Sequence, residues 1–307
     1  MDVVERIRAT GLLPEGGPVV VLLSGGRDSV CLLDVAARIG DATALHVNYG
    51  LRPDAGADEA VCRSACARLE VPLTVERVVR PDGAGNLQAW ARDVRYAIGT
   101  RLAVERDGLL AAGHTATDQA ETILYRLASS PSRRALLGMA AADGRLVRPL
   151  LGITREDTAA HCLSRGLGWA DDATNDTDAY ARGRVRAGLV PALEAVHPAA
   201  QRNVLRAAQL LREEAAVLDE IVDTALAGRD HVTLGHLRIL PPALGRLVLR
   251  RLAEDAVGGL CPRVSARFEE VVELGDHAML DLGDGARAVV EAGVLRFERT
   301  PSLPVAH

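Results

Sequence analysis

The sequence predicts an α/β protein: a doubly wound, mainly parallel sheet, followed by a helical linker and a small α+β C-terminal domain. Strand-like hydrophobic runs alternate with helical patterns over roughly the first 150 residues. A long amphipathic run follows, and beyond it short strand-like segments are separated by glycine turns. The length of 307 residues makes two domains the default expectation.

The first half of the chain supplies four expected strands. Residues 19–23 form a continuous aliphatic run that ends at a glycine-rich turn, as buried parallel strands do. The other expected strands are 43–47, 73–79 and 109–112. The helical patterns that alternate with them are 29–39, 58–69, 88–104 and 117–127. This alternation is typical of βαβ units, in which ligands bind at the carboxyl ends of the strands.

The strand pattern fades from about residue 154, and a helix is expected over 154–165. An amphipathic run over 204–226 is interpreted as a connecting helix. Beyond it the expected helices are 237–256 and 264–274, and the expected strands are 278–282, 286–290 and 294–297. We therefore predict an α/β domain over 1–200, a helical linker over 201–229 and an α+β domain over 230–307.

Composition excludes several classes of protein. All 36 basic residues are arginines, so the chain has no lysine of its own for a Walker-type phosphate loop or a Schiff base. No run approaches the length of an apolar membrane span, and the opening residues lack a signal-peptide core, so a cytoplasmic protein without membrane partners is expected. The five scattered cysteines indicate neither a disulfide framework nor a zinc site, and Cys62 and Cys66 are expected in the core.

The net charge of −5 argues against a general polyanion binder, but the charge is distributed unevenly. Residues 126–212 contain 13 arginines and eight acidic residues, so this part carries a net charge of +5 while the remainder carries −10. A basic middle in an acidic protein favours a nucleic-acid docking surface there.

The segment that follows the first expected strand has the features of a phosphate-binding loop. Its two glycines permit a tight turn with backbone N–H groups close to an anion, and the helix that starts there adds the positive end of its dipole. An aspartate in such a loop repels phosphate unless a divalent cation lies between them, so Asp28 is expected to bind magnesium; an N-capping role is the alternative. The expected phosphate-binding residues are Ser24, Gly25, Gly26, Arg27, Asp28 and Ser29.

Two further pairs of charged residues have helical spacing. Asp118 and Glu121 lie three residues apart at a helix start, where their carboxylates share one face and repel each other without a cation or a basic partner. A magnesium ion shared with Asp28 is the functional interpretation, and helix capping is the alternative. Arg92 and Arg95 are spaced to clamp a phosphate or to balance these carboxylates, with solvated surface charge as the alternative.

The spelling SGGRDS after a strand resembles the PP-loop of the N-type ATP pyrophosphatases, which cleave ATP between its α and β phosphates. Six further segments narrow the resemblance. They are His46–Arg52, Asn86–Tyr96, Gly113–Thr122, Arg148–Leu151, Ala170–Asp176 and Tyr180–Arg186. In this order and spacing they resemble the tRNA(Ile)-lysidine synthetases, over about residues 19–198.

This resemblance implies an ATP-dependent ligase that attaches free lysine to carbon 2 of the wobble cytidine of the CAU-anticodon isoleucine tRNA. The reaction passes through an adenylated tRNA and releases pyrophosphate and AMP, with Mg²⁺ as cofactor. The implied catalytic residues are Asp28, Arg92, Arg95, Asp118 and Glu121, of which Asp28, Asp118 and Glu121 are the implied metal ligands. His46 and His114 are expected beside ATP, with a structural role as the alternative for His114.

The basic middle of the chain is the expected tRNA surface, together with the C-terminal domain. The residues expected to contact tRNA are Arg133, Arg134, Asn175, Arg182, Arg184 and Arg186. Phosphate contacts of this kind position an RNA without reading its sequence. The first two are expected in a loop after the helix of Glu121. The last three alternate along the chain and do not share a helix face, so pairing with nearby acidic residues is the alternative for some of them.

Four positions depart from the usual spelling of the family: Tyr49, Thr115, Thr117 and Gly183. The nearest alternative function is that of another PP-loop enzyme such as a tRNA thiolase, but those enzymes commonly use CxxC cysteines, which this chain lacks. A catalytically silent RNA-binding relative is the alternative from a different class. The sequence leaves open which residues hold lysine, how the isoleucine tRNA is distinguished from methionine tRNAs, and whether the chain forms a homodimer.

Overall fold

The computed structural model describes residues 2–50, 55–81, 85–130, 133–170 and 181–301. The chain divides into two compact units, Met1–Gln209 and Leu210–His307. The division falls within one long helix, α10 (Ala200–Leu226), rather than at the ends of the predicted linker.

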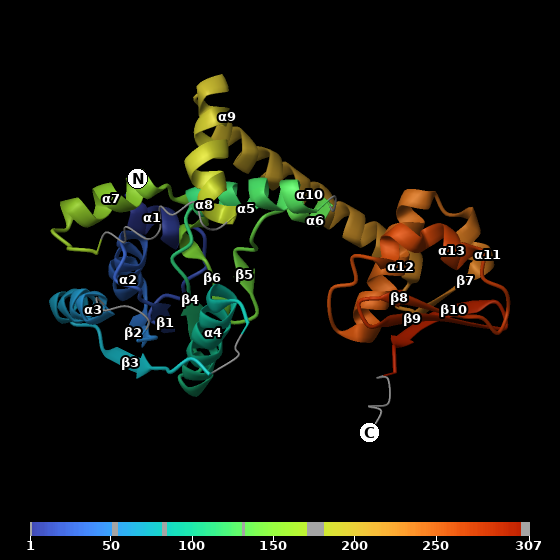
Figure 1. Ribbon diagram of the computed structural model, residues 1–307, viewed down its shortest axis with the longest axis horizontal. Coiled ribbons are helices and arrows are strands. Elements are labelled where there is room, and N and C mark those ends of the chain that lie inside the picture. Colours follow the sequence, from blue (N-terminus) through green and yellow to red (C-terminus); the bar gives the residue numbers. More distant parts are fainter. Residues whose placement is uncertain (1, 51–54, 82–84, 131–132, 171–180, 302–307) are drawn as a thin grey trace. The chain divides into compact units, whose positions relative to one another are not determined.

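The first unit is built on a six-stranded sheet with the strand order β3-β2-β1-β4-β6-β5. Its strands are β1 (Pro18–Leu22), β2 (Asp41–Asn48), β3 (Leu73–Arg77), β4 (Leu109–Ala111), β5 (Ala142–Asp143) and β6 (Leu146–Val147). All neighbours pair in parallel except β5, which is antiparallel to β6. The doubly wound, mainly parallel sheet is thus confirmed (Figure 1). The strand order reverses between β1 and β4, and their carboxyl ends therefore form the expected ligand crevice.

The predicted helices of this unit are present with slightly different ends. Its helices are α1 (Val3–Arg8), α2 (Arg27–Ile39), α3 (Ala55–Leu69), α4 (Leu87–Glu105), α5 (Ala116–Ser129), α6 (Arg133–Leu136), α7 (Arg155–Ser164), α8 (Ala181–Arg184) and α9 (Val190–Val196). A 3₁₀ turn, Pro149–Gly152, precedes α7, and a π-helical turn, Val185–Leu189, joins α8 to α9. Figure 1 shows α2 and α4 on opposite sides of the sheet.

Strand β1 is buried on both faces. Val19 and Val21 belong to the core that includes residues of α1, α2 and α7, whereas Val20 and Leu22 belong to a second core with α4. Burial of each such side chain stabilises the fold by about 2 kcal/mol. Because neither face of β1 meets water, its sequence shows no polar alternation, which is why the run 19–23 predicts a parallel strand.

A buried ionic cluster joins α2 to α7. The Asp34 side chain is 1% exposed, and its carboxylate lies 2.7 Å from Nε2 of His161 and 3.1 Å from Nε of Arg38. Nη2 of Arg165 lies 3.5 Å from the same carboxylate. Burial by itself raises the pKa of Asp34, but the hydrogen bond from His161 and the charges of the two arginines outweigh it and hold this pKa below its usual value. The cluster therefore fixes α7 against α2.

Asp34→Asn is expected to lower the free energy of unfolding by about 2 kcal/mol at pH 7, because the amide loses charge-assisted hydrogen bonds. The pKa of Asp34 is lower in the folded chain than in the unfolded chain. Its stabilisation is therefore fully present above about pH 4 and is lost as the pH falls through the folded-state pKa. Urea unfolding of both proteins over this range measures the difference. A deficit that does not shrink on acidification would contradict this role for Asp34.

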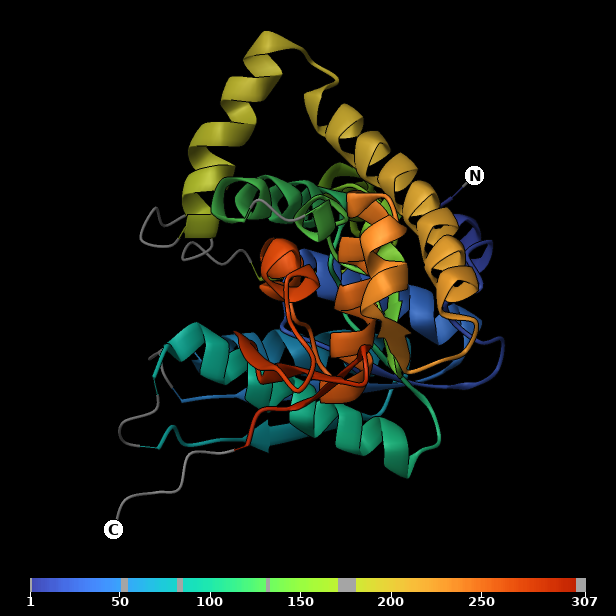
Figure 2. The ribbon, with the colours of Figure 1, turned by 90° about the vertical axis from the view of Figure 1, so that its right-hand side faces the viewer.

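The second unit contains an antiparallel sheet with the order β7-β10-β9-β8. Its elements are β7 (His231–Thr233), α11 (Leu234–Ile239), α12 (Pro242–Val257), α13 (Phe268–Val272), β8 (Met279–Gly283), β9 (Ala286–Glu291) and β10 (Val294–Arg299). The helices lie on one side of this sheet (Figures 1 and 2). Val222 and Leu226, at the end of α10, belong to its hydrophobic core, so this part of the predicted linker is packed into the second unit.

The prediction of one helix over 237–256 is wrong. Helix α11 ends at Ile239 and α12 begins at Pro242. Proline lacks a backbone N–H and disfavours a helical conformation of the residue before it, so the pair Pro241-Pro242 ends one helix and starts another. The helix expected over 264–274 is a 3₁₀ turn, Val264–Arg267, followed by the five-residue α13.

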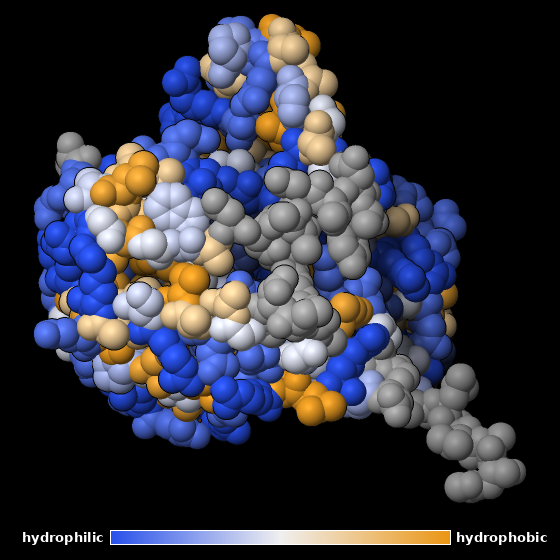
Figure 3. All heavy atoms as spheres, turned by 60° about the vertical axis from the view of Figure 1, so that its left-hand side comes forward, coloured by the Kyte–Doolittle hydropathy of each residue, from blue (hydrophilic) through white to orange (hydrophobic). Residues whose placement is uncertain are grey.

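The helices in the described ranges include none that is long and apolar enough to cross a membrane. The face drawn in Figure 3 is largely hydrophilic, with apolar residues scattered over it in small groups. All five cysteines are buried, as predicted for Cys62 and Cys66.

Candidate active site

The loop between β1 and α2 has the shape expected of an anion-binding turn. Gly25 has φ +89°, and a Cβ atom on it would lie 3.2 Å from the backbone oxygen of Asp58, so only glycine fits without strain. Oγ of Ser29 donates to the Gly26 carbonyl at 2.7 Å and accepts from Oγ of Ser24 at 3.1 Å, which closes the turn. Gly26 is the N-cap of α2 and supplies no side chain to its first-turn N–H groups, which suits them to bind an anion.

Asp28 lies in the first turn of α2 and is not its N-cap, so the capping alternative is wrong for this residue. Its Oδ1 accepts a hydrogen bond of 2.5 Å from Oγ1 of Thr158 on α7 and lies 3.2 Å from Nε of Arg27. A Cβ atom on Gly113, at the end of β4, would lie 3.2 Å from the backbone oxygen of Asp28. Glycine at this position therefore lets the end of β4 approach the start of α2.

Asp118 and Glu121 project from the first turns of α5, which begins after Thr115. Oγ1 of Thr115 accepts from the backbone N–H of Asp118 at 3.3 Å, and the backbone N–H of Thr115 donates to Oδ2 of Asp118 at 2.9 Å. This capping box uses one carboxylate oxygen of Asp118, so the capping alternative is correct for that oxygen. The other oxygen and the fully buried Glu121 face basic side chains.

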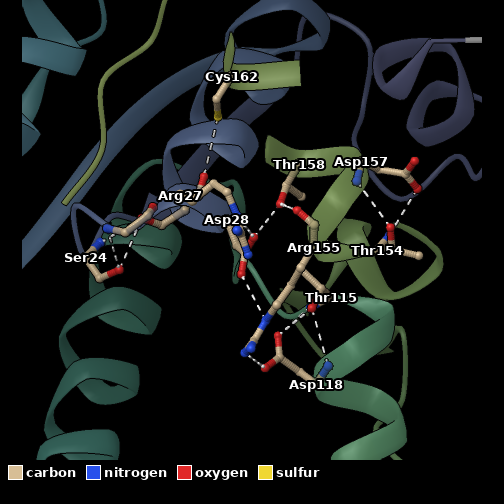
Figure 4. A network of polar contacts seen from close by, with 12 residues as sticks. Ser24, Arg27, Asp28, Thr115, Asp118, Thr154, Arg155, Asp157, Thr158 and Cys162 are labelled. Carbon is tan, nitrogen blue, oxygen red and sulfur yellow. Dashed lines mark hydrogen bonds and ion pairs between the residues drawn. The ribbon is translucent and has the colours of Figure 1, made fainter. Parts of the chain in front are cut away.

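Arg155, the first residue of α7, connects the three carboxylates. Figure 4 shows its side chain between Asp28 and Asp118. Its Nη2 donates to Oδ1 of Asp118 at 3.0 Å, its Nε lies 3.8 Å from Oδ2 of Asp28, and its Nη1 lies 3.8 Å from Oε1 of Glu121. The capping box of Thr154 and Asp157 fixes the start of α7 and hence the position of Arg155. Sequence reasoning missed this arginine; the T-x-x-D pattern around it predicts the helix start but not the direction of the side chain.

Arg186 also reaches the carboxylates. Its Nε donates to Oε1 of Glu121 at 2.7 Å and its Nη2 to Oε2 at 3.1 Å, a bidentate pair, and Nη2 lies 3.8 Å from Asp118. Arg186 thus pairs with a proposed catalytic acid, and its predicted contact with tRNA phosphates stays a prediction. With Arg27, whose Nε lies 3.2 Å from Asp28, three guanidinium groups face the three carboxylates.

The residues that the structure describes include no group of three or more His, Cys, Asp or Glu side chains arranged to hold a metal ion. The predicted ligands Asp28, Asp118 and Glu121 do converge, but they converge on the guanidinium of Arg155. The three carboxylates therefore stabilise a positive charge between them, and carboxylate oxygens are ligands that Mg²⁺ prefers. These residues fit a divalent cation only if the guanidinium moves.

Comparison with known proteins identifies the family. A family model described as PP-loop domain matches residues 5–193. The tRNA(Ile)-lysidine synthase of Salinispora arenicola is 36% identical over 320 residues, which cover 97% of this chain and 93% of that protein. The chain belongs to the tRNA(Ile)-lysidine synthase family. The family member of Chromobacterium violaceum is 41% identical over 298 residues, covering 90% of this chain.

The chain is shorter than several members of the family. It spans 66% of the Chromobacterium violaceum protein and 51% of the member from Thermus thermophilus, which is 36% identical over 260 residues. Among solved structures, the U34-tRNA thiolase NcsA from Methanococcus maripaludis has a TM-score of 0.59 at 17% identity, over 68% of this chain and 78% of that chain. At this identity the likeness concerns the fold alone.

The arginine pair Arg92 and Arg95 lies on α4 and packs on an aromatic ring. The guanidinium carbons of Arg92 and Arg95 lie 4.8 and 5.6 Å from the ring centroid of Tyr96. Nε of Arg95 and the hydroxyl of Tyr96 are buried with no hydrogen-bond partner among the described residues. Arg27, Arg155 and Arg186 pair with the carboxylates. A phosphate-binding role therefore remains the prediction for Arg92 and Arg95, with solvated surface charge as the alternative.

Two positions that depart from the family spelling have structural roles. Thr115 forms the capping box of α5. The hydroxyl of Tyr49 donates to the carbonyl of Ala91 at 2.7 Å, and its ring meets Trp90 edge-on at 5.7 Å, which ties the end of β2 to α4. Burial raises the pKa of Tyr49, so this hydroxyl stays protonated at neutral pH.

The two histidines expected beside ATP differ in position. His46 is buried, and its Nδ1 lies 3.0 Å from the carbonyl oxygen of Leu23, so it contacts the backbone just before the loop. His114 follows Gly113 at the end of β4 and is partly exposed. An ATP contact stays a prediction for both.

The residues expected to contact tRNA are spread over several elements. Arg133 and Arg134 lie in the short helix α6, so their predicted loop location is wrong. Arg182 and Arg184 lie in α8, where Arg184 is exposed. Asn175 and the side chain of Arg182 lie outside the part of the chain that the structure describes. RNA contact stays a prediction for these residues.

Proposed function

We propose that this chain is a tRNA(Ile)-lysidine synthetase, a ligase that forms a carbon–nitrogen bond between lysine and the wobble cytidine of the CAU-anticodon isoleucine tRNA. The observation that carries the proposal is the meeting of Asp28, Asp118 and Glu121 beside the N-terminus of α2. Carboxylates beside a helix N-terminus suit a nucleoside triphosphate with a divalent cation, once the guanidinium of Arg155 has moved. The expected place of action is the cytoplasm, where the tRNA substrate is found.

In the proposed first step, ATP binds with its phosphates at the loop Ser24–Ser29. The carbonyl oxygen of the cytosine attacks the α-phosphorus, and the bond between the α and β phosphates breaks. Pyrophosphate leaves, and the base carries AMP. The first-turn N–H groups of α2 stabilise the negative charge that moves onto pyrophosphate. Mg²⁺ held by Asp28, Asp118 and Glu121 would supply further neutralisation of this charge.

In the second step, the ε-amine of free lysine attacks carbon 2 of the activated base. The bond from this carbon to the AMP oxygen breaks, AMP leaves and the amine loses a proton. Adenylation is required because the cytosine carbonyl oxygen is otherwise a poor leaving group. The product pairs with adenosine instead of guanosine, so the tRNA reads isoleucine codons in place of the methionine codon.

Omission of single components tests this function. Purified protein is incubated with ATP, Mg²⁺, lysine and unmodified isoleucine tRNA transcript, and AMP release is followed. We expect AMP release only when ATP, Mg²⁺, lysine and the tRNA are all present. AMP release without tRNA would indicate a different acceptor, and tRNA binding with no ATP turnover would indicate a catalytically silent RNA-binding relative.

A thiolase function is not favoured. Burial raises the pKa of the Cys62 thiol to about 12 and that of Cys66 to about 11, so neither is a thiolate at neutral pH. All five cysteines are buried and the sequence has no CxxC pair. Sulfur transfer by a cysteine of this chain would contradict the proposal.

Arg133→Gln combined with Arg134→Gln is expected to weaken tRNA binding, because two phosphate contacts are lost. In a plot of log affinity against log salt concentration, the magnitude of the slope should decrease by about 1.5. Filter binding at several salt concentrations measures it. Arg101→Gln, on α4 and paired with Glu76 at 3.0 Å, is the matched control and should leave the slope unchanged. Equal slopes for the wild type, the double variant and the control would show that Arg133 and Arg134 do not contact tRNA phosphates.

A further inference from the structure

The site described above contains a cation that belongs to the chain itself, the guanidinium of Arg155. It contacts Asp28, Asp118 and Glu121 at 3.8, 3.0 and 3.8 Å. Those residues are the ligands proposed above for Mg²⁺. Two cations cannot occupy one set of carboxylate oxygens, so the guanidinium and the metal ion compete for this place.

Arg155 is held less firmly than its neighbour Arg186. Arg186 makes two hydrogen bonds to Glu121, at 2.7 and 3.1 Å. Arg155 makes one close bond to the cluster, to Asp118, and its Nε is buried without a hydrogen-bond partner among the described residues. The two side chains are equally exposed, at 23% and 24%, so the difference between them lies in their hydrogen bonds. Moving Arg155 therefore breaks few hydrogen bonds, whereas moving Arg186 breaks a bidentate pair.

The Arg155 guanidinium also has a suitable second partner once ATP is present. It lies beside Asp28, in the first turn of the helix whose N-terminus is proposed to bind the phosphates. A guanidinium displaced from carboxylates pairs well with phosphate oxygens, which offer the same two-oxygen geometry.

We propose that Arg155 is an exchangeable counterion: it neutralises the three carboxylates in the nucleotide-free protein and moves to a nucleotide phosphate when the divalent cation takes its place. This inference rests on the proposed ATP- and Mg²⁺-dependent function. One consequence is that the metal binds weakly to the protein alone and tightly together with ATP. A second is that removing the guanidinium improves metal binding and impairs nucleotide binding.

The first part of the test measures Mn²⁺ binding to the nucleotide-free, full-length protein by electron paramagnetic resonance. Arg155→Gln is expected to lower the Kd for Mn²⁺ at least about tenfold relative to wild type, because its carboxylates lose a competing cation. Adding Asp118→Asn to this variant should abolish the gain in affinity for Mn²⁺. Arg155→Lys keeps the positive charge and should bind Mn²⁺ as weakly as wild type. It serves as a second variant at this position in case Arg155→Gln does not fold.

Arg6→Gln is the matched control, because Nη1 of Arg6 pairs at 2.9 Å with Asp157, a carboxylate of α7 outside the cluster. It should leave the Kd for Mn²⁺ unchanged. An unchanged Kd in Arg155→Gln, or an equal gain in Arg6→Gln, would overturn the proposal.

The second part measures the affinity for a non-hydrolysable ATP analogue with Mg²⁺ by calorimetry. Arg155→Gln should weaken it at least about tenfold, and Arg6→Gln should not change it. Unchanged nucleotide affinity in Arg155→Gln would overturn the exchange of partners. Neither part uses tRNA or lysine. Failure of the wild-type protein to make lysidine would therefore count against the proposed function alone. The role of Arg155 is tested separately by the Kd for Mn²⁺ and the affinity for the ATP analogue.

Discussion

Asp28→Asn is expected to reduce AMP formation at least about a thousandfold, to the background of the assay. The substitution is nearly isosteric, and the amide oxygen still accepts the hydrogen bond of Thr158 that Oδ1 accepts in the wild type. What it removes is the negative charge at the start of α2, which the proposed cation needs. The variant should therefore fold normally, bind tRNA and fail at adenylation. Release of AMP from ATP, tRNA and lysine is the measurement.

A matched control is Asp107→Asn, the same chemical change at an exposed carboxylate. The Asp107 side chain is 92% exposed and pairs with Arg145 at 3.0 Å. Its φ of +48° is one that asparagine adopts readily, so no strain is introduced. This control should form AMP at the wild-type rate. Wild-type-like AMP formation by Asp28→Asn would contradict the role assigned to the loop.

Glu121→Gln has the second largest expected effect and acts on both rate and stability. Loss of this charge should lower AMP formation by about two to three orders of magnitude while leaving tRNA binding largely intact. The Glu121 side chain is 1% exposed and holds Arg186 by two hydrogen bonds. Removing one partner of a buried ion pair costs about 3 kcal/mol, but Arg186 is 24% exposed and partly solvated, so we expect about 2 kcal/mol.

The double variant Glu121→Gln with Arg186→Gln separates the two effects. It removes the uncompensated guanidinium along with the carboxylate, so part of the lost stability should return while AMP formation stays low. Urea unfolding and the AMP assay measure the two quantities. If the double variant were as unstable as the sum of the two single variants, the ion pair of Glu121 and Arg186 would not hold α5 to the π-helical turn.

The sequence predicts the fold well where a pattern is local. The strand at 19–23 and the loop that follows it are a continuous run and a short motif, and both form as expected. Local patterns fail where a segment is too short or where a single residue overrides the period. Strand β7 has three residues, too few to show alternation, and Pro241-Pro242 interrupts a hydrophobic pattern that is otherwise helical.

The partners of the site acids could not be predicted from the sequence. Asp118 and Glu121 stand out because two acids share a helix start, but the arginines that neutralise them come from distant parts of the chain. Arg186 is 65 residues from Glu121 along the chain and is one of 36 arginines, so neither spacing nor composition distinguishes it. Only the packing of α5, α7 and the π-helical turn brings these charges together.

The most direct measurement of the central claim is transfer of the ATP α-phosphate to tRNA when lysine is left out. With α-labelled ATP, Mg²⁺ and the CAU-anticodon transcript, the wild-type protein should yield labelled tRNA, and later addition of lysine should release the label as AMP. Asp28→Asn should yield no labelled tRNA. Labelled AMP formed without passing through tRNA, or tRNA that never carries the label, would contradict the account.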